Sequence, residues 1–384
     1  MKISFYEYNS FLVSIYIYYQ LLNNISRILL IPPIFPIIIM IILSSLMIFE
    51  IKNINLKSLF LLFVFLCIFI LNIILTKENL EVIGFHFMKF LAYGILASLV
   101  GSLKIKSNSL EKWLTILSYI NIFIMMYIGF RRQEIYLEIG YMTFGTNLLI
   151  SPLILFYLDL KNKKRISINK IMIILSLVIL LIYGNRFSIL LSFLGIIILD
   201  WSYRKNNYKK WLIYSFFSFG LGIIYLNLKE ILLWIYNIFS NLEYKMYGLL
   251  RLINSLERAE VGKDISSGRM ELYKDAVEVI FNNPFGIGIF GYLKEIKYAF
   301  LGYYPHNIFL EIGMHWGILG LVIFIIFLFK LLKKIANTQE KSYKIFLILL
   351  ALFNLRLLLS DTYISYSFFW LLIAISFNKS YQIL

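Results

Sequence analysis

Long apolar segments without charged residues recur along the whole chain. The runs 37–49, 59–75, 171–183 and 317–329 contain no Lys, Arg, Asp or Glu. With uncharged polar flanks, many reach about 18–20 residues, the length of a helix that spans the hydrocarbon core of a bilayer. A soluble domain cannot bury so much apolar surface. The pattern therefore predicts an all-α polytopic membrane protein.

About twelve transmembrane helices fit this pattern, separated by mostly short polar connections. The predicted spans lie near residues 5–24, 29–49, 58–76, 83–103, 113–130, 141–160, 168–184, 186–202, 211–227, 307–330, 344–360 and 362–377. The N-terminus lacks a basic segment and a small-residue cleavage site, so the first span is expected to be an uncleaved anchor.

Basic residues are distributed unequally between the two sets of loops. With a cytoplasmic N-terminus, the inner segments carry 21 Lys and Arg and the short outer loops carry 5. Because loops rich in Lys and Arg stay in the cytoplasm, both termini are expected there, in the inner membrane. The predicted domains are a membrane domain of spans 1–9 (1–227), one large extracytoplasmic loop (228–306) and a membrane domain of spans 10–12 (307–384). The net charge of +16 thus reflects topology and requires no nucleic-acid partner.

The sequence offers few metal ligands. A single cysteine, Cys67, lies in an apolar run, and the histidines are His86, His306 and His315. These residues form neither a disulfide framework nor a Cys/His cluster. No metal and no cofactor are expected.

The 228–306 loop is predicted to contain amphipathic helices. Residues 228–258 have the pattern of a helix near the membrane surface, and a second helix is expected from Ser267 or Gly268 to about Asn282. Its apolar face is predicted to consist of Met270, Tyr273, Val277 and Ile280.

Arg269 stands out in the first turn of this second helix, where the helix dipole disfavours a cation. An anion opposite Arg269 would explain it, because a helix N-terminus and an Arg together form a phosphate site. A salt bridge to Asp264 explains it equally well.

A G-x-G-x-x-G spacing occurs at Gly286, Gly288 and Gly291. A dinucleotide-binding turn needs a strand before the glycines and a helix after them. Here a helix and Pro284 precede them, on the predicted extracytoplasmic side. The dinucleotide interpretation is rejected, and the glycines are expected to allow tight turning and close packing.

Three segments together resemble the bacterial O-antigen polymerase and ligase family, with the polymerase branch favoured. They read SGRMELYKDAVEVIFNNPFGIGIFGY, PHNIFLEIGMHWGILGLVIF and YGNRFSILLSFLGIIIL, and GYMTFGTNLLISPLIL is a looser fourth. The resemblance covers residues 140–377 and the twelve-span layout. It implies a metal-independent glycosyltransferase that uses a polyprenyl-diphosphate-linked oligosaccharide within membrane lipid, outside the cytoplasm.

The resemblance also assigns candidate site residues. Arg186 and Arg269 are expected to bind the donor diphosphate, and His306 is expected to be the general base or, alternatively, a further phosphate ligand. Supporting candidates are Asn307, which would orient His306, Glu311, and the outer-loop residues Arg131 and Arg132.

Other polar residues in the spans have weaker interpretations. His315 is more typical of packing than of chemistry. Lys89 and Arg356 lie inside predicted spans, where a charge is costly and is usually paired or functional. Lys89 is expected to pair with Glu81 or to reach the membrane surface. Arg356 is expected to pair with Asp361 or to face the cavity at the outer leaflet that the family resemblance implies.

Two alternatives to a polymerase remain open. A ligase of the same family would transfer finished glycan to another acceptor, and a flippase for lipid-linked oligosaccharides would also have about twelve spans and a basic cavity. The long outer loop with its Arg-led helix argues against transport. A chain-length regulator protein is a candidate partner of a polymerase.

The charge asymmetry makes a testable prediction about topology. A reporter enzyme that is active only outside the cytoplasm should be active when fused at Lys263 and silent when fused at Lys163. The opposite activities would reverse the predicted orientation.

Overall fold

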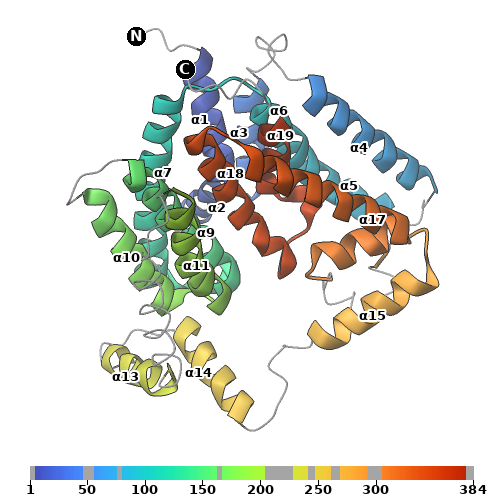
Figure 1. Cartoon of the computed structure of the whole chain (residues 1–384). Helices are drawn as coiled ribbons and strands as arrows, with labels where there is room; N and C mark the ends of the chain where they lie inside the picture. Colours follow the sequence, from blue (N-terminus) through green and yellow to red (C-terminus); the bar gives the residue numbers. More distant parts are fainter. Residues whose placement is uncertain are drawn as a thin grey trace. The chain divides into compact units, whose positions relative to one another are not determined.

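The computed structural model describes residues 5–45, 56–75, 80–161, 167–203, 228–240, 247–260, 269–292 and 305–377 (Figure 1). Within these ranges the regular structure is entirely helical, which agrees with the predicted all-α class. The chain divides into two compact units: Met1–Tyr19, Ile31–Trp113 and Ser266–Leu384 form the first, and Gln20–Leu30 and Leu114–Ile265 form the second. The predicted division by membrane topology remains a prediction.

The first unit contains helices from both ends of the sequence. They are α1 (Phe5–Ile17), α3 (Ile34–Ser45), α4 (Leu56–Leu75), α5 (Leu80–Phe90), the π-helix η3 (Leu91–Ile95), α6 (Leu96–Gly101), α15 (Arg269–Asn282), α17 (Ile308–Asn337), α18 (Lys341–Asn354), the 3₁₀ turns η5 (Leu355–Leu358) and η6 (Tyr363–Ser365), and α19 (Ser367–Phe377).

The second unit contains the middle of the sequence. Its helices are α8 (Gln133–Ile139), α9 (Tyr141–Lys161), α10 (Ile168–Tyr183), α11 (Arg186–Tyr203), α13 (Leu228–Ser240) and α14 (Tyr247–Glu260). Two further helices, α2 (Tyr19–Ile28) and α7 (Ser107–Arg131), begin at the end of a first-unit segment and continue into the second unit.

Within the described residues, four helices are long and apolar enough to cross a membrane: α7, α9, α11 and α17. Shorter apolar helices occur at several of the other predicted spans, including α3, α10 and α19. The predicted span at 211–227 lies outside the described residues. The chain is thus a helical membrane protein, and the number of twelve spans remains a prediction.

Helix α9 is the most buried of the long helices, and it packs against α10 and α11 within the second unit. Polar groups also join α9 to α7: the side-chain amide of Asn121 donates to the carbonyl oxygen of Asn147 and to the hydroxyl of Ser151, each at 2.9 Å. Within a membrane such bonds replace the hydrophobic driving force between helices.

In the first unit, α19 packs against α6 and α18. Its indole Trp370 donates to the backbone oxygens of Tyr363 and Ile364, at 2.9 and 3.1 Å. Phe65 of α4 lies edge-on to Trp370, with ring centroids 4.8 Å apart. An aromatic layer therefore joins α4, α19 and the segment before α19.

Helix α15 ends at Asn282, as predicted, but the predicted apolar face is only partly right, since Ile280 is buried and other members of that face are not. The residues buried along α15 are Leu272, Ala276 and Ile280, whereas Met270 and Val277 are exposed. The neighbouring helix α17 decides which side of α15 is covered (Figure 1).

The loop after α15 is bonded to α17 through the backbone. The Ile287 N–H donates to the Met314 oxygen at 2.8 Å, and the Ile318 N–H donates to the Pro284 oxygen at 2.9 Å. Helix α17 is interrupted at this point by Gly317, whose φ of 70° and ψ of −169° are not helical. The interruption frees backbone groups of α17, and the loop satisfies them.

Two glycines with positive φ make this contact possible. A β-carbon on Gly317 would lie 2.0 Å from the Pro284 oxygen, and one on Gly286 would lie 2.5 Å from the His315 oxygen. The glycines therefore serve close packing, as expected after the dinucleotide interpretation was rejected.

The contact predicts that Gly317→Ala is strongly destabilising. Alanine at positive φ costs about 1–2 kcal/mol, and the clash with Pro284 adds to this cost. The apparent melting temperature of the purified protein in detergent should fall clearly. Gly140 is the matched control, because its φ is +76° but a β-carbon on it would meet nothing within 4 Å. Equal losses for Gly140→Ala and Gly317→Ala would show that the backbone contact contributes nothing.

Candidate functional site

The N-terminus of α17 carries the candidate base. Asn307 caps the helix, because its side-chain oxygen accepts from the Phe309 N–H at 2.9 Å and from the Leu310 N–H at 3.4 Å. His306 precedes the cap with a φ of 52°, an unusual value for a residue other than glycine. The cap and the strained backbone hold His306 outside the helix. The expected orienting role of Asn307 remains a prediction.

Arg269 and His306 lie at the same end of two helices that run in the same direction. Ile280 of α15 packs over Gly313 of α17, with a β-carbon on Gly313 only 2.7 Å from the Ile280 Cδ1 atom. Four residues further along the chain, Pro284 bonds to Ile318 of α17. This register places the beginnings of α15 and α17 together.

The influence of Arg269 on the pKa of His306 agrees with this register of α15 and α17. The pKa of His306 is lowered from its ordinary value to about 4, first by burial and then by the positive charge of Arg269. His306 is therefore neutral at physiological pH. The structure thus brings together two of the predicted site residues, a cation and a neutral imidazole.

Glu311 lies one turn into α17 and is buried, with 1% of its surface exposed. The Thr362 hydroxyl donates to its carboxyl group, and so does the backbone N–H of Tyr363. Glu311 is therefore directed toward the segment before α19. Its proposed supporting role remains a prediction.

Arg186 belongs to the second unit, so its geometry is described there alone. It is the first residue of α11 and is exposed. The preceding Asn185 accepts from the Ser188 N–H at 2.8 Å and donates to the Met142 oxygen at 2.9 Å. Asn185 thereby caps α11 and ties its first turn to α9. Arg186 consequently extends from a fixed helix N-terminus.

The other two arginines are in different environments. Arg132 forms an ion pair with Glu134 at the start of α8. Arg131, the last residue of α7, is exposed. Glu134 therefore partly neutralises the charge of Arg132. A role for Arg131 or Arg132 in donor binding remains a prediction.

A charged cluster before α19 was only partly anticipated from the sequence. Arg356 pairs with Asp361 at 2.6 Å, one of the two arrangements expected for it. Lys89 of α5 lies within electrostatic reach of the same carboxylate. Lys89 and Arg356 stand out in the sequence because a charged residue inside a membrane span is usually paired or functional. Nothing in the sequence indicated that Thr362, beside Asp361, bonds to Glu311.

His315 is packed within the first unit, as expected. It is fully buried, its Nε2 atom accepts from the Phe290 N–H at 3.1 Å, and its Nδ1 atom lies 3.1 Å from the Tyr363 hydroxyl. These bonds attach the loop after α15 to the segment before α19.

Among the described residues there is no group of three or more His, Cys, Asp or Glu side chains that could hold a metal ion. The expected independence from metals therefore remains to be tested by experiment.

Residues 171–325 match the family model described as O-antigen ligase. The match includes Arg186, Arg269 and His306, and it confirms the resemblance drawn from the sequence motifs. Over these residues, which are less than half of the chain, the protein is similar to the O-antigen ligase family. Neither the curated proteins nor the solved structures contain a significant match to the chain.

The low pKa of His306 predicts an unusual acid limit for activity. A histidine at its ordinary pKa of about 6.5 would lose its basic form below that pH. His306 should keep the basic form until the pH falls to about 4. The pH dependence of kcat/KM reports the pKa values of groups in the free protein. We therefore expect kcat/KM to stay constant from pH 8 to pH 5 and to decline at lower pH. A decline centred at 6.5 would contradict the burial of His306 beside Arg269.

Proposed function

We propose that this protein polymerises polyprenyl-diphosphate-linked oligosaccharide repeat units into a surface polysaccharide, O-antigen or capsule, on the outer face of the cytoplasmic membrane. The family match over 171–325 points to a glycosyl transfer from a lipid-linked sugar. The main structural support for the proposal is that Arg269 and a neutral His306 lie near each other at the start of two adjacent helices.

The reaction needs positive charge at the leaving group. As the bond between the anomeric carbon and the diphosphate oxygen breaks, negative charge accumulates on the diphosphate. An Arg side chain stabilises this charge through two parallel hydrogen bonds. Arg269 and Arg186 each lie in the first turn of a helix, where free backbone N–H groups also favour an anion.

The reaction also needs a base for the acceptor sugar. The acceptor hydroxyl oxygen attacks the anomeric carbon, and its proton passes to His306. In the free protein burial lowers the pKa of His306, and the positive charge of Arg269 lowers it further. A diphosphate bound to Arg269 would offset that charge and raise the pKa of His306. Donor binding would then strengthen the base at the moment it is needed.

A ligase of the same family is the alternative, since it would use the same donor chemistry with a different acceptor. Purified protein given only the lipid-linked repeat unit distinguishes the two. A polymerase lengthens the unit, whereas a ligase leaves it unchanged until a second acceptor is added.

A flippase is the alternative from a different class. Deletion of a polymerase gene leaves donor on the outer leaflet, whereas deletion of a flippase gene retains it inside. A chain-length regulator, if it is a partner, should alter product length and leave the rate of single transfers unchanged.

The proposal predicts the effects of substitution at the three main residues. Arg186→Lys and Arg269→Lys keep the charge but lose the planar fork, so polymer formation should fall strongly. His306→Ala and His306→Gln should lower the rate by about 10²–10⁴-fold, because neither side chain accepts the proton. The assay is conversion of purified lipid-linked repeat units by protein in liposomes. Normal turnover by His306→Ala would remove its role as base.

Two controls accompany this assay. Arg258→Lys, at an exposed position in the last turn of α14, should leave activity unchanged. Treatment with a chelator should also leave activity unchanged, since the proposed chemistry uses no metal. Activity that is lost with the chelator and restored by a divalent ion would remove the metal-independent mechanism.

A further inference from the structure

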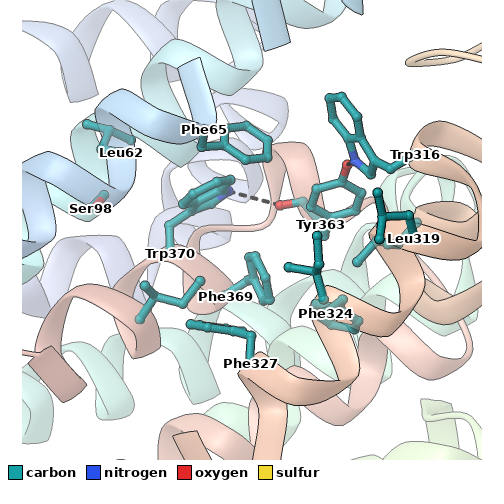
Figure 2. A pocket seen from close by; sticks show the side chains of 14 residues that line it. Leu62, Phe65, Ser98, Trp316, Leu319, Phe324, Phe327, Tyr363, Phe369 and Trp370 are labelled. Atoms are coloured by element: carbon teal, nitrogen blue, oxygen red, sulfur yellow. Dashed lines mark hydrogen bonds between the residues drawn. The ribbon is translucent and has the colours of Figure 1, made fainter. Parts of the chain in front are cut away.

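A cavity of about 410 Å³ lies within the first unit, and its lining includes neither Arg269 nor His306 (Figure 2). Its wall comes from α4, α6, α17, α19 and the segment before α19. Half of the lining side chains are aromatic: Phe65, Trp316, Phe324, Phe327, Tyr363, Phe369 and Trp370. The lining contains no charged side chain, so the cavity suits a neutral, mostly apolar ligand.

Tyr363 is one of the lining residues, and the hydrogen bonds around its hydroxyl determine what that hydroxyl can still donate to. The Tyr363 hydroxyl oxygen accepts from the Trp316 indole N–H at 2.8 Å. The Nε2 atom of His315 accepts from the Phe290 N–H. The neutral ring therefore carries its hydrogen on Nδ1, which donates to the same Tyr363 oxygen at 3.1 Å.

Tyr363 thus accepts two hydrogen bonds and retains its own O–H hydrogen. The nearby Glu311 carboxyl group accepts from the Thr362 hydroxyl, and no hydrogen bond joins it to the Tyr363 hydroxyl among the described residues. Among the described residues the phenolic hydrogen meets no acceptor. A buried donor without an acceptor is costly, and a ligand acceptor in the adjoining cavity would remove that cost.

The dimensions of the wall suit a hydrocarbon chain. Lining residues of α17 after its interruption run from Leu319 to Phe327. At the helical rise this is about 12 Å, close to the ~15 Å of one leaflet of the hydrocarbon core. In the predicted topology Tyr363 lies at the outer end of this wall. The polar end of the cavity would then meet the ester region of the outer leaflet.

We propose that the cavity binds one acyl chain of a membrane glycerolipid, whose ester carbonyl accepts the hydrogen bond from Tyr363. A hydrocarbon tail matches the aromatic wall, and a neutral ester can accept a hydrogen bond from the Tyr363 hydroxyl. An isoprenoid chain has no acceptor along its length, and a diphosphate would need cations that the lining lacks. The proposal concerns a structural lipid and does not depend on the proposed function.

The test compares two lipids that differ only at the linkage. Native mass spectrometry of the full chain in detergent measures retention of dioleoyl phosphatidylglycerol and of its di-ether analogue. One hydrogen bond corresponds to about a two- to tenfold preference. The wild type should retain one ester lipid with that preference over the ether lipid. Tyr363→Phe should bind both lipids equally, at the level of the ether lipid on the wild type.

Two further variants sharpen the comparison. Tyr343→Phe removes a phenol that donates to the Ile375 oxygen outside the cavity, so the ester preference should persist. Ser98→Leu enlarges a side chain in the wall and should weaken retention of both lipids.

Three results would overturn the proposal. The first is equal retention of ester and ether lipids by the wild type. The second is an ester preference that survives Tyr363→Phe. The third is displacement of the glycerolipid by undecaprenyl phosphate at equal concentration, which would assign the cavity to an isoprenoid chain.

Discussion

The backbone contact between the loop after α15 and the interrupted helix α17 determines the geometry of the candidate site. The bonds from Ile287 to Met314 and from Ile318 to Pro284 fix the register of α15 and α17, which residues 283–307 connect. That register brings Arg269 and His306 to the same end. A shift of one turn would move the two residues about 5 Å relative to each other. The chemistry proposed for the pair depends on this contact.

Much of the fold follows from the sequence because apolar runs and helix boundaries depend on local properties. The end of α15 at Asn282 was predicted from the following Pro284, which cannot continue a helix. The buried face of α15 was partly mispredicted because hydrophobic periodicity ranks side chains by polarity, whereas burial depends on what packs against them. The interruption at Gly317 also escaped the sequence, because it lies in an uninterrupted apolar run.

The candidate site shows the same division between local and distant information. Arg269 and His306 were identified from their motifs and from a charge in an unfavourable position. The bond between Glu311 and Thr362 joins residues 51 positions apart, and no periodicity reveals such a pairing. The charged residues within predicted spans did indicate a polar centre, and Arg356 with Asp361 forms part of one. Charge in an apolar context was thus the most informative sequence signal.

The loop after α15 is held by its main chain, and this has a consequence for how the sequence can change. Phe285 is 90% exposed, and the bonds of the loop to α17 use backbone atoms on either side of it. Side-chain identity at Phe285 is therefore weakly constrained by this contact. Gly286 and Gly317, in contrast, tolerate no side chain without movement of the backbone. The loop can accept substitutions at Phe285 while the distance between the two helices stays the same. An altered sequence would have to preserve the close approach between the backbone of this loop and the backbone of α17, more than any particular side chain.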